Sequence, residues 1–71
     1  MKIIFTNHAR ERMQERGISE KEVIECIQHS DNVLKDDTHV CRFQRRFSHG
    51  ILQVVAEQKR NYFVVITVYP L

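Results

Sequence analysis

The residues best suited to chemistry in this chain recur at a regular spacing near its start. His8, Arg12 and Arg16 are four residues apart, so in a helix all three side chains project from one face. Like charges at this spacing repel each other unless an anion lies beside them. Histidine exchanges protons near neutral pH, and arginine binds phosphate through paired hydrogen bonds. The stripe therefore predicts an anion at this face, either a carboxylate of the fold or a phosphate from outside.

Metal-independent cleavage of RNA is a reaction that these residue types could carry out. It needs a group that titrates near neutral pH and fixed cations that stabilise charge on the phosphoryl oxygens. We predict catalytic roles for His8, Arg12 and Tyr69, with Tyr69 stacking on a base or donating a proton. The residues predicted to contact the substrate are Arg16, Arg42, Arg46 and Thr67.

Structural roles compete with this interpretation. His8, beside a helix start, could bond a backbone carbonyl, and Arg12 and Arg16 could pair with Glu15 or Glu20. Exposed pairs of this kind contribute only ~0–1 kcal/mol. The alternative function is therefore a non-catalytic, small basic domain that binds RNA or an acidic protein partner.

Two helices are predicted to position the first of these residues. Thr6 or Asn7 can cap a helix that begins near His8 and ends at Gly17. A capping box at residues 19–22 then starts a second, acidic helix over residues 20–28. Residues 31–38 are predicted to form a loop, with Val33 and Leu34 against the core.

Strand patterns account for the rest of the chain. Residues 2–5 predict an edge strand, and residues 40–48 alternate before a hairpin turn at His49-Gly50. That turn would pair Phe43 with Ala56 and Arg42 with Glu57.

The second hairpin has two possible registers. A three-residue turn at 59–61 puts Val64, Ile66 and Val68 in the core and Thr67 and Tyr69 on the outer face, whereas a two-residue turn reverses this. We predict the three-residue turn, because its purely aliphatic set makes the better core. The predicted fold is α+β: two N-terminal helices packed on one face of an antiparallel three- to four-stranded sheet, in one domain of residues 1–71. Arg42 and Arg46 would lie on the outer face, out of reach of His8, or else a site would form at the sheet edge from His8, Arg12 and Tyr69 or Thr67.

Composition and charge limit the class of protein. The chain is 42% hydrophobic and 28% charged, which excludes a disordered segment. It has no apolar run of about 18 residues, so we expect a cytoplasmic protein without a membrane partner. Residues 20–37 hold six acids and two bases, which leaves a net charge of +6 on the remainder. Such asymmetry is compatible with an RNA-binding face.

The two cysteines suit free thiols in a reducing compartment. Cys26 with His29, and His39 with Cys41, could together supply four zinc ligands. Their spacing matches no familiar zinc site, and nothing holds the two pairs together. We therefore predict buried thiols, surface histidines, and no metal or cofactor.

With these features, the chain resembles a family of short prokaryotic domains marked by a helix of the form H-A-x-x-R-M-x-x-R-x-I-S. Here it reads HARERMQERGIS over residues 8–19, and a closing strand VVITVYP follows over 64–70. The family is usually grouped with the RelE-like, barnase–EndoU–colicin type of toxin fold. The resemblance implies a two-helix-plus-sheet architecture, a metal-independent ribonuclease activity and an antitoxin partner. Because 71 residues build only a small core, a homodimer is a further possible assembly.

Overall fold

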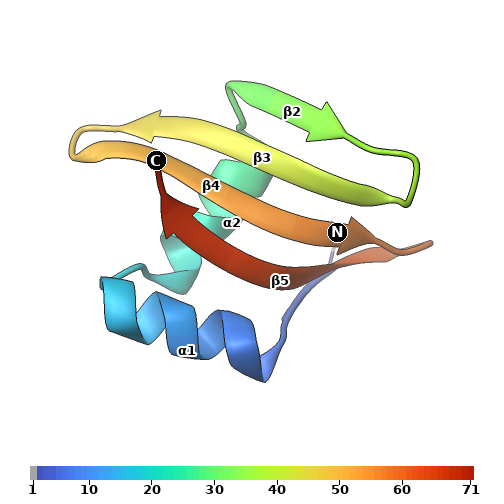
Figure 1. Cartoon of the computed structure of the whole chain (residues 1–71), viewed down its shortest axis with the longest axis horizontal. Coiled ribbons are helices and arrows are strands. Elements are labelled where there is room, and N and C mark those ends of the chain that lie inside the picture. The colour runs from blue at the N-terminus through green and yellow to red at the C-terminus, as the bar shows by residue number, and fades with distance from the viewer. Residues whose placement is uncertain (1) are drawn as a thin grey trace.

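A computed structural model describes residues 2–71. In chain order its elements are β1 (Lys2–Phe5), α1 (Asn7–Arg16), α2 (Glu20–Gln28), β2 (Asn32–Lys35), β3 (Val40–Phe47), β4 (Gly50–Gln58) and β5 (Tyr62–Pro70). The strands form one sheet in the order β1-β5-β4-β3-β2 (Figure 1). The α+β class is confirmed. The predicted antiparallel sheet of three to four strands is wrong in detail, because five strands pair and β1 runs parallel to β5.

The prediction that both helices pack together on one face of the sheet is wrong in detail, because they contact different parts of it. α2 packs across β3 and β4, while α1 lies beside β5 (Figure 1). Their apolar sides enclose one core, made of Ala9, Met13, Val23, Cys26, Ile27, Cys41, Phe43, Leu52, Val54, Ala56, Val65 and Val68. Side chains alternate between the two faces of a sheet. We call the face turned away from α2 the open face, defined by Arg42, Gln44, Arg46, Gln53, Thr67 and Tyr69. Within residues 2–71, neither helix has the length and apolar character that a membrane crossing needs.

Both ends of α1 follow the predicted capping residues. Thr6 is the N-cap, and its side chain accepts a hydrogen bond from the Ala9 N–H at 3.0 Å. Gly17 ends the helix with φ of 65°, a left-handed conformation that glycine adopts without steric cost. The helix therefore starts and stops where the local sequence dictates.

α2 begins at the predicted capping box. The Ser19 hydroxyl accepts from the Glu22 N–H at 3.1 Å, and the Glu22 carboxylate accepts from the Ser19 N–H at 3.0 Å. The pKa of Glu22 is lowered from its ordinary value of 4.5, chiefly because its carboxylate accepts the Ser19 N–H. The capping box thus favours the charged form of Glu22.

Replacing Glu22 by glutamine should lower the free energy of unfolding at neutral pH. A carboxyl whose pKa is lower when folded stabilises the protein fully above its unfolded pKa, and that stabilisation is lost as pH falls through the folded pKa. Glutamine keeps the capping geometry but not the charge. Urea unfolding at about pH 7 and about pH 3 should therefore show a difference from wild type at the higher pH that shrinks at the lower one. Glu11→Gln, an exposed change on α1, is the control. If Glu22→Gln lowered the free energy of unfolding equally at both pH values, the charge of Glu22 would not be the cause.

The segment between α2 and β3 differs from prediction. Residues 32–35 form the edge strand β2, which pairs with β3, rather than part of a loop. Val33 and Leu34 are 41% and 45% exposed, so they do not pack against the core as expected. Residues 32–35 lack the β-branched and aromatic run that identified the equally short strand at residues 2–5, and they pair along the edge that β3 offers.

The turn between β3 and β4 lies one residue earlier than predicted. Ser48 and His49 form it, and Gly50 begins β4 with φ of 137°. As a result Phe43 pairs with Val54, and not with Ala56. The register moves by two residues, which keeps each side chain on its expected face.

This register also corrects a predicted ion pair. Arg42 lies opposite Val55, so the expected pairing of Arg42 with Glu57 is wrong. Glu57 lies opposite Val40 and forms an ion pair with Lys59 at 3.3 Å. Arg42 therefore stays exposed on the open face.

A bulge makes both predicted registers of the β4–β5 hairpin partly correct. The Lys59 N–H donates to the Tyr62 carbonyl, which closes a two-residue turn rather than the preferred three-residue one. Ala56 then pairs with Val65, but Val55 pairs with Thr67, so Ile66 is the extra residue.

The consequences for the core follow directly. Val65 and Val68 are fully buried, whereas Ile66 is 36% exposed and Val64 lies opposite Glu57 on the other face. The prediction of Val64 and Ile66 as core residues is therefore wrong. The prediction of Val68 as a core residue is confirmed. Thr67 and Tyr69 lie on the outer face, as the three-residue turn predicted.

Candidate functional site

The predicted helix stripe lies along one half of β5. β1 pairs only with residues 62–65 of β5, and α1 lies beside the strand (Figure 1). Two contacts fix α1 in this position. The Thr6 hydroxyl donates to the Ile66 carbonyl at 3.3 Å, and an Arg16 N–H donates to the Val68 carbonyl at 2.6 Å. α1 therefore runs in the same direction as β5, with its stripe beside the strand that carries Thr67 and Tyr69.

The three stripe residues have different environments. His8 is exposed and makes no side-chain hydrogen bond within residues 2–71. Arg12 pairs with Glu15 at 2.5 Å, while its buried Nε has no partner among the described residues. Arg16 is held by a backbone carbonyl. Of the structural ion pairs considered for Arg12 and Arg16, only that of Arg12 with Glu15 forms. Glu20 pairs with Arg10 instead, at 2.7 Å.

Four polar residues form a continuous row across the open face, which we call the polar row. They lie opposite one another on four adjacent strands: Asn32, Gln44, Gln53 and Tyr69. The Asn32 amide donates to Gln44 at 3.3 Å, and the Gln44 amide donates to Gln53 at 2.6 Å. The Gln53 amide in turn donates to the Tyr69 hydroxyl oxygen.

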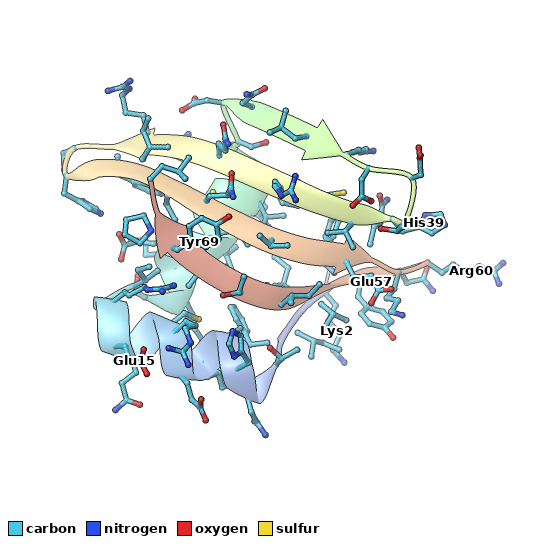
Figure 2. The ribbon with its side chains drawn as sticks, in the orientation of Figure 1. Lys2, Glu15, His39, Glu57, Arg60 and Tyr69 are labelled. Carbon is cyan, nitrogen blue, oxygen red and sulfur yellow. The ribbon has the colours of Figure 1, made fainter. Side chains whose placement is uncertain are left out.

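The direction of these bonds fixes what Tyr69 can do. Its oxygen accepts from Gln53, so the phenolic proton is left to donate elsewhere. Figure 2 shows the Tyr69 side chain lying over the sheet on its open face. Gln53 is only 5% exposed, and a buried amide of this kind holds its partner firmly because losing the bond leaves it unsatisfied. The polar row therefore presents one oriented O–H donor at β5.

Two predicted arginines flank the polar row. Arg42 and Arg46 lie two residues to either side of Gln44 on β3, and both are exposed. They share the open face with Thr67 and Tyr69, as predicted. The stripe and these arginines approach Tyr69 from different sides, since α1 lies next to β5 whereas β3 is separated from β5 by β4.

The four residues considered as zinc ligands, Cys26, His29, His39 and Cys41, do not form a candidate metal site among the described residues. No group of three or more histidine, cysteine or acidic side chains within residues 2–71 could hold a metal ion. The Cys26 thiol donates to the Phe43 carbonyl at 3.4 Å, and burial raises the pKa of Cys26 to about 11. Cys26 is therefore a protonated core residue, and Cys41 is buried beside it in the same core.

Comparison with known proteins assigns the chain to a family. A family model described as a domain of unknown function, DUF4258, matches residues 5–70. The chain belongs to this family. No match was found among curated proteins or among solved structures. The description of DUF4258 names no activity, so the toxin-type fold and the ribonuclease activity implied by the sequence are still expectations.

In this DUF4258 domain, sequence reasoning missed two groups of residues. The first is the polar row, because asparagine and glutamine carry no chemical signature and their alignment depends on the register of four strands. The second is His49, an exposed residue that was predicted only to form part of the hairpin turn. Its Nε2 lies 3.0 Å from the Glu22 carboxylate. Only the position of the β3–β4 turn brings this histidine to α2.

Proposed function

We propose that this domain cleaves RNA without a metal ion where α1 lies along the second half of β5. One observation carries the proposal. Contacts from Thr6 and Arg16 hold α1 against the β5 carbonyls, which aligns the His8 stripe with the strand that presents the Tyr69 hydroxyl. A proton acceptor, cations and an oriented proton donor are then available on neighbouring elements.

Each residue has a defined role in the proposed reaction. The His8 imidazole takes the proton of the ribose 2′-hydroxyl, whose oxygen attacks the adjacent phosphorus. Arg12 stabilises the charge that develops on the phosphoryl oxygens. Tyr69 donates its phenolic proton to the leaving 5′-oxygen as the P–O bond breaks. The products are a 2′,3′-cyclic phosphate and a free 5′-hydroxyl.

The open face supplies the binding surface in this proposal. Arg42 and Arg46 are exposed guanidinium groups that can pair with phosphates on either side of the scissile bond. Arg16 and Thr67 contact the RNA chain beside β5, and the Tyr69 ring offers a stacking surface for a base. An antitoxin that inhibited the activity would need to cover this face.

Cleavage of structured RNA in the presence of EDTA tests the proposal. Wild-type protein should cleave, and His8→Ala should reduce the rate by about 10²–10⁴-fold because it removes the proton acceptor. Arg12→Ala should reduce it as well. The matched control is Arg10→Ala, since Arg10 lies on the same helix but pairs with Glu20 and packs over Phe5. Equal cleavage by wild type and His8→Ala would overturn the assignment of His8.

A non-catalytic RNA-binding domain is the second candidate. It is favoured by the exposed His8 side chain, which no hydrogen bond within residues 2–71 orients for proton transfer. In that case wild-type protein would bind RNA in EDTA without cleaving it, and Arg42→Ala and Arg46→Ala would weaken binding and reduce its salt dependence.

A further inference from the structure

A cavity of about 130 Å³ lies at the end of the molecule where both helices approach the β3–β4 turn. Its walls come from the end of α1, the first turn of α2, the β3–β4 turn and the end of β5. Ile18, Ile51 and Pro70 make part of the lining apolar. Arg16, Glu22 and His49 are its charged or titratable residues, and the remaining lining side chains are uncharged.

The His49 side chain is 68% exposed in its turn, but it makes two contacts. Its Nε2 lies 3.0 Å from the Glu22 carboxylate, and its ring stacks on Phe47 with centroids 5.7 Å apart and planes inclined by 21°. A carboxylate at one ring nitrogen fixes which nitrogen carries a proton. The other nitrogen, Nδ1, has no partner within residues 2–71 and is left to bond a ligand.

With His49 protonated, the side chains that line the cavity carry two positive charges against the one negative charge of Glu22. The Glu22 carboxylate is already engaged, because it accepts hydrogen bonds from the N–H and the hydroxyl of Ser19. Arg16 donates one N–H to the Val68 carbonyl, and a guanidinium has five N–H donors in all. Arg16 and His49 both line a space of only about 130 Å³, which is small enough for the two side chains to share one bound group.

We propose that this cavity binds the phosphate of a phosphate monoester, held by Arg16 and by His49 in its protonated form. Paired guanidinium hydrogen bonds suit the tetrahedral phosphate, and the apolar walls suit the first atoms of its organic group. The volume is below the roughly 300 Å³ of a typical ligand pocket. The cavity therefore takes the phosphate and only part of the attached group. Phosphate binding at this cavity does not require that the domain cleave RNA.

Binding should depend on pH because an imidazole gains its charge in the range of pH 5–8. Inorganic phosphate titrated into the full chain and followed by NMR should shift the His49 ring resonances. Because phosphate ionises in the same range, the quantity to measure is the ratio of wild-type to His49→Gln affinity, which should be at least about fivefold larger at about pH 6 than at about pH 8. AMP should bind more tightly than inorganic phosphate, because its ester carbon contacts the apolar walls.

Two variants and one control make the test specific. His49→Gln should weaken phosphate binding at about pH 6 and leave only the pH dependence that comes from the ionisation of phosphate itself, and Arg16→Gln should weaken binding at both pH values. His29→Gln, an exposed histidine at the end of α2, should change neither. Because Arg16 also contacts Val68, its variant could fail to fold, and His49→Gln in the exposed turn then decides the result alone.

The source of the phosphate is resolved by a third probe. Tighter binding of a 5′-phosphorylated trinucleotide than of AMP would identify the end of an RNA chain, whereas equal or weaker binding would identify a free small phosphate. The proposal is overturned if tens of millimolar phosphate leave the His49 resonances unshifted, or shift those of His29 and His39 equally. RNA cleavage in EDTA is measured separately, so its failure and the failure of this site are distinguishable.

Discussion

Replacing Phe43 by alanine should remove about 3–5 kcal/mol from the free energy of unfolding. Phe43 is 6% exposed and lies in the middle of β3. Its ring meets Phe63 of β5 edge-to-face, with centroids 5.4 Å apart and planes at 88°. Truncation would lose this aromatic contact and leave a cavity that the neighbouring strands cannot close.

The loss would be large relative to the whole stability of the domain. A domain of 71 residues has a free energy of unfolding of roughly 4–11 kcal/mol at the usual value per residue. The backbone carbonyl of residue 43 accepts a hydrogen bond from the Cys26 thiol of α2, and alanine keeps this contact. Phe43→Ala should therefore act through the lost packing of the ring, including its contact with Phe63 of β5.

Urea unfolding followed by circular dichroism measures this effect. Phe43→Leu is the matched control, since it keeps most of the buried volume, and it should cost less than about 2 kcal/mol. Phe47→Ala, at a half-buried position near the turn, should also be milder. If Phe43→Ala lowered the free energy of unfolding by less than about 1 kcal/mol, the core would not be organised around this ring.

The helices were predictable from the sequence because their signals are local. Thr6, Gly17 and the Ser19–Glu22 box each act within four residues, and each lies where it was expected. The face of each β3 residue was also predictable, since alternation survives a register error of two. Strand pairing is not local. The parallel pairing of β1 with β5 and the addition of β2 depend on edges that exist only after the sheet has formed.

The bulge at Ile66 shows where a sequence pattern is ambiguous. Residues 64–68 are all β-branched and only Thr67 is polar, so either register of β5 gives a mainly apolar core face. The structure uses one register near the turn and the other beyond Ile66. Because of this change, Val65 is buried while Thr67 and Tyr69 still face outward. No hydrophobicity pattern distinguishes this arrangement from a regular strand.

The candidate site was predictable only in its charged members. The spacing of His8, Arg12 and Arg16 identified the stripe, and alternation placed Arg42 and Arg46 on the face of Tyr69. Gln53 could not be identified, because its role arises from the register that aligns it with Tyr69. His49 and Glu22 likewise meet only through the turn at residues 48–49.

Replacing Tyr69 by phenylalanine should reduce RNA cleavage by about 10²–10⁴-fold, if the domain acts as proposed. The change removes only the phenolic oxygen and keeps the ring that stacks on a base. The Gln53 amide donates a hydrogen bond to the Tyr69 oxygen. The phenolic proton of Tyr69 is therefore free to reach the leaving 5′-oxygen. RNA affinity, measured by fluorescence anisotropy, should change by no more than about threefold because stacking and phosphate contacts remain.

The variant should also carry a small and separable stability cost. Without the Tyr69 oxygen, the amide of the 5%-exposed Gln53 loses its acceptor, and a buried donor left unsatisfied costs about 1–3 kcal/mol. Cleavage must therefore be measured at a temperature where unfolding data show the variant fully folded. Tyr62→Phe, at the other end of β5, is the control and should leave cleavage unchanged.

Gln53 provides the decisive comparison, because it acts on Tyr69 without supplying the proton. Gln53→Met keeps the Tyr69 hydroxyl but removes the donor that orients it. We expect a slower cleavage rate than in wild type but a faster one than in Tyr69→Phe, and no further loss when Gln53→Met is added to Tyr69→Phe. If Tyr69→Phe cleaves as fast as wild type, Tyr69 serves only to stack, and the proton must reach the leaving oxygen from another group. If the two changes instead act additively, Gln53 does not work through Tyr69, because only residues that share one function show non-additive effects.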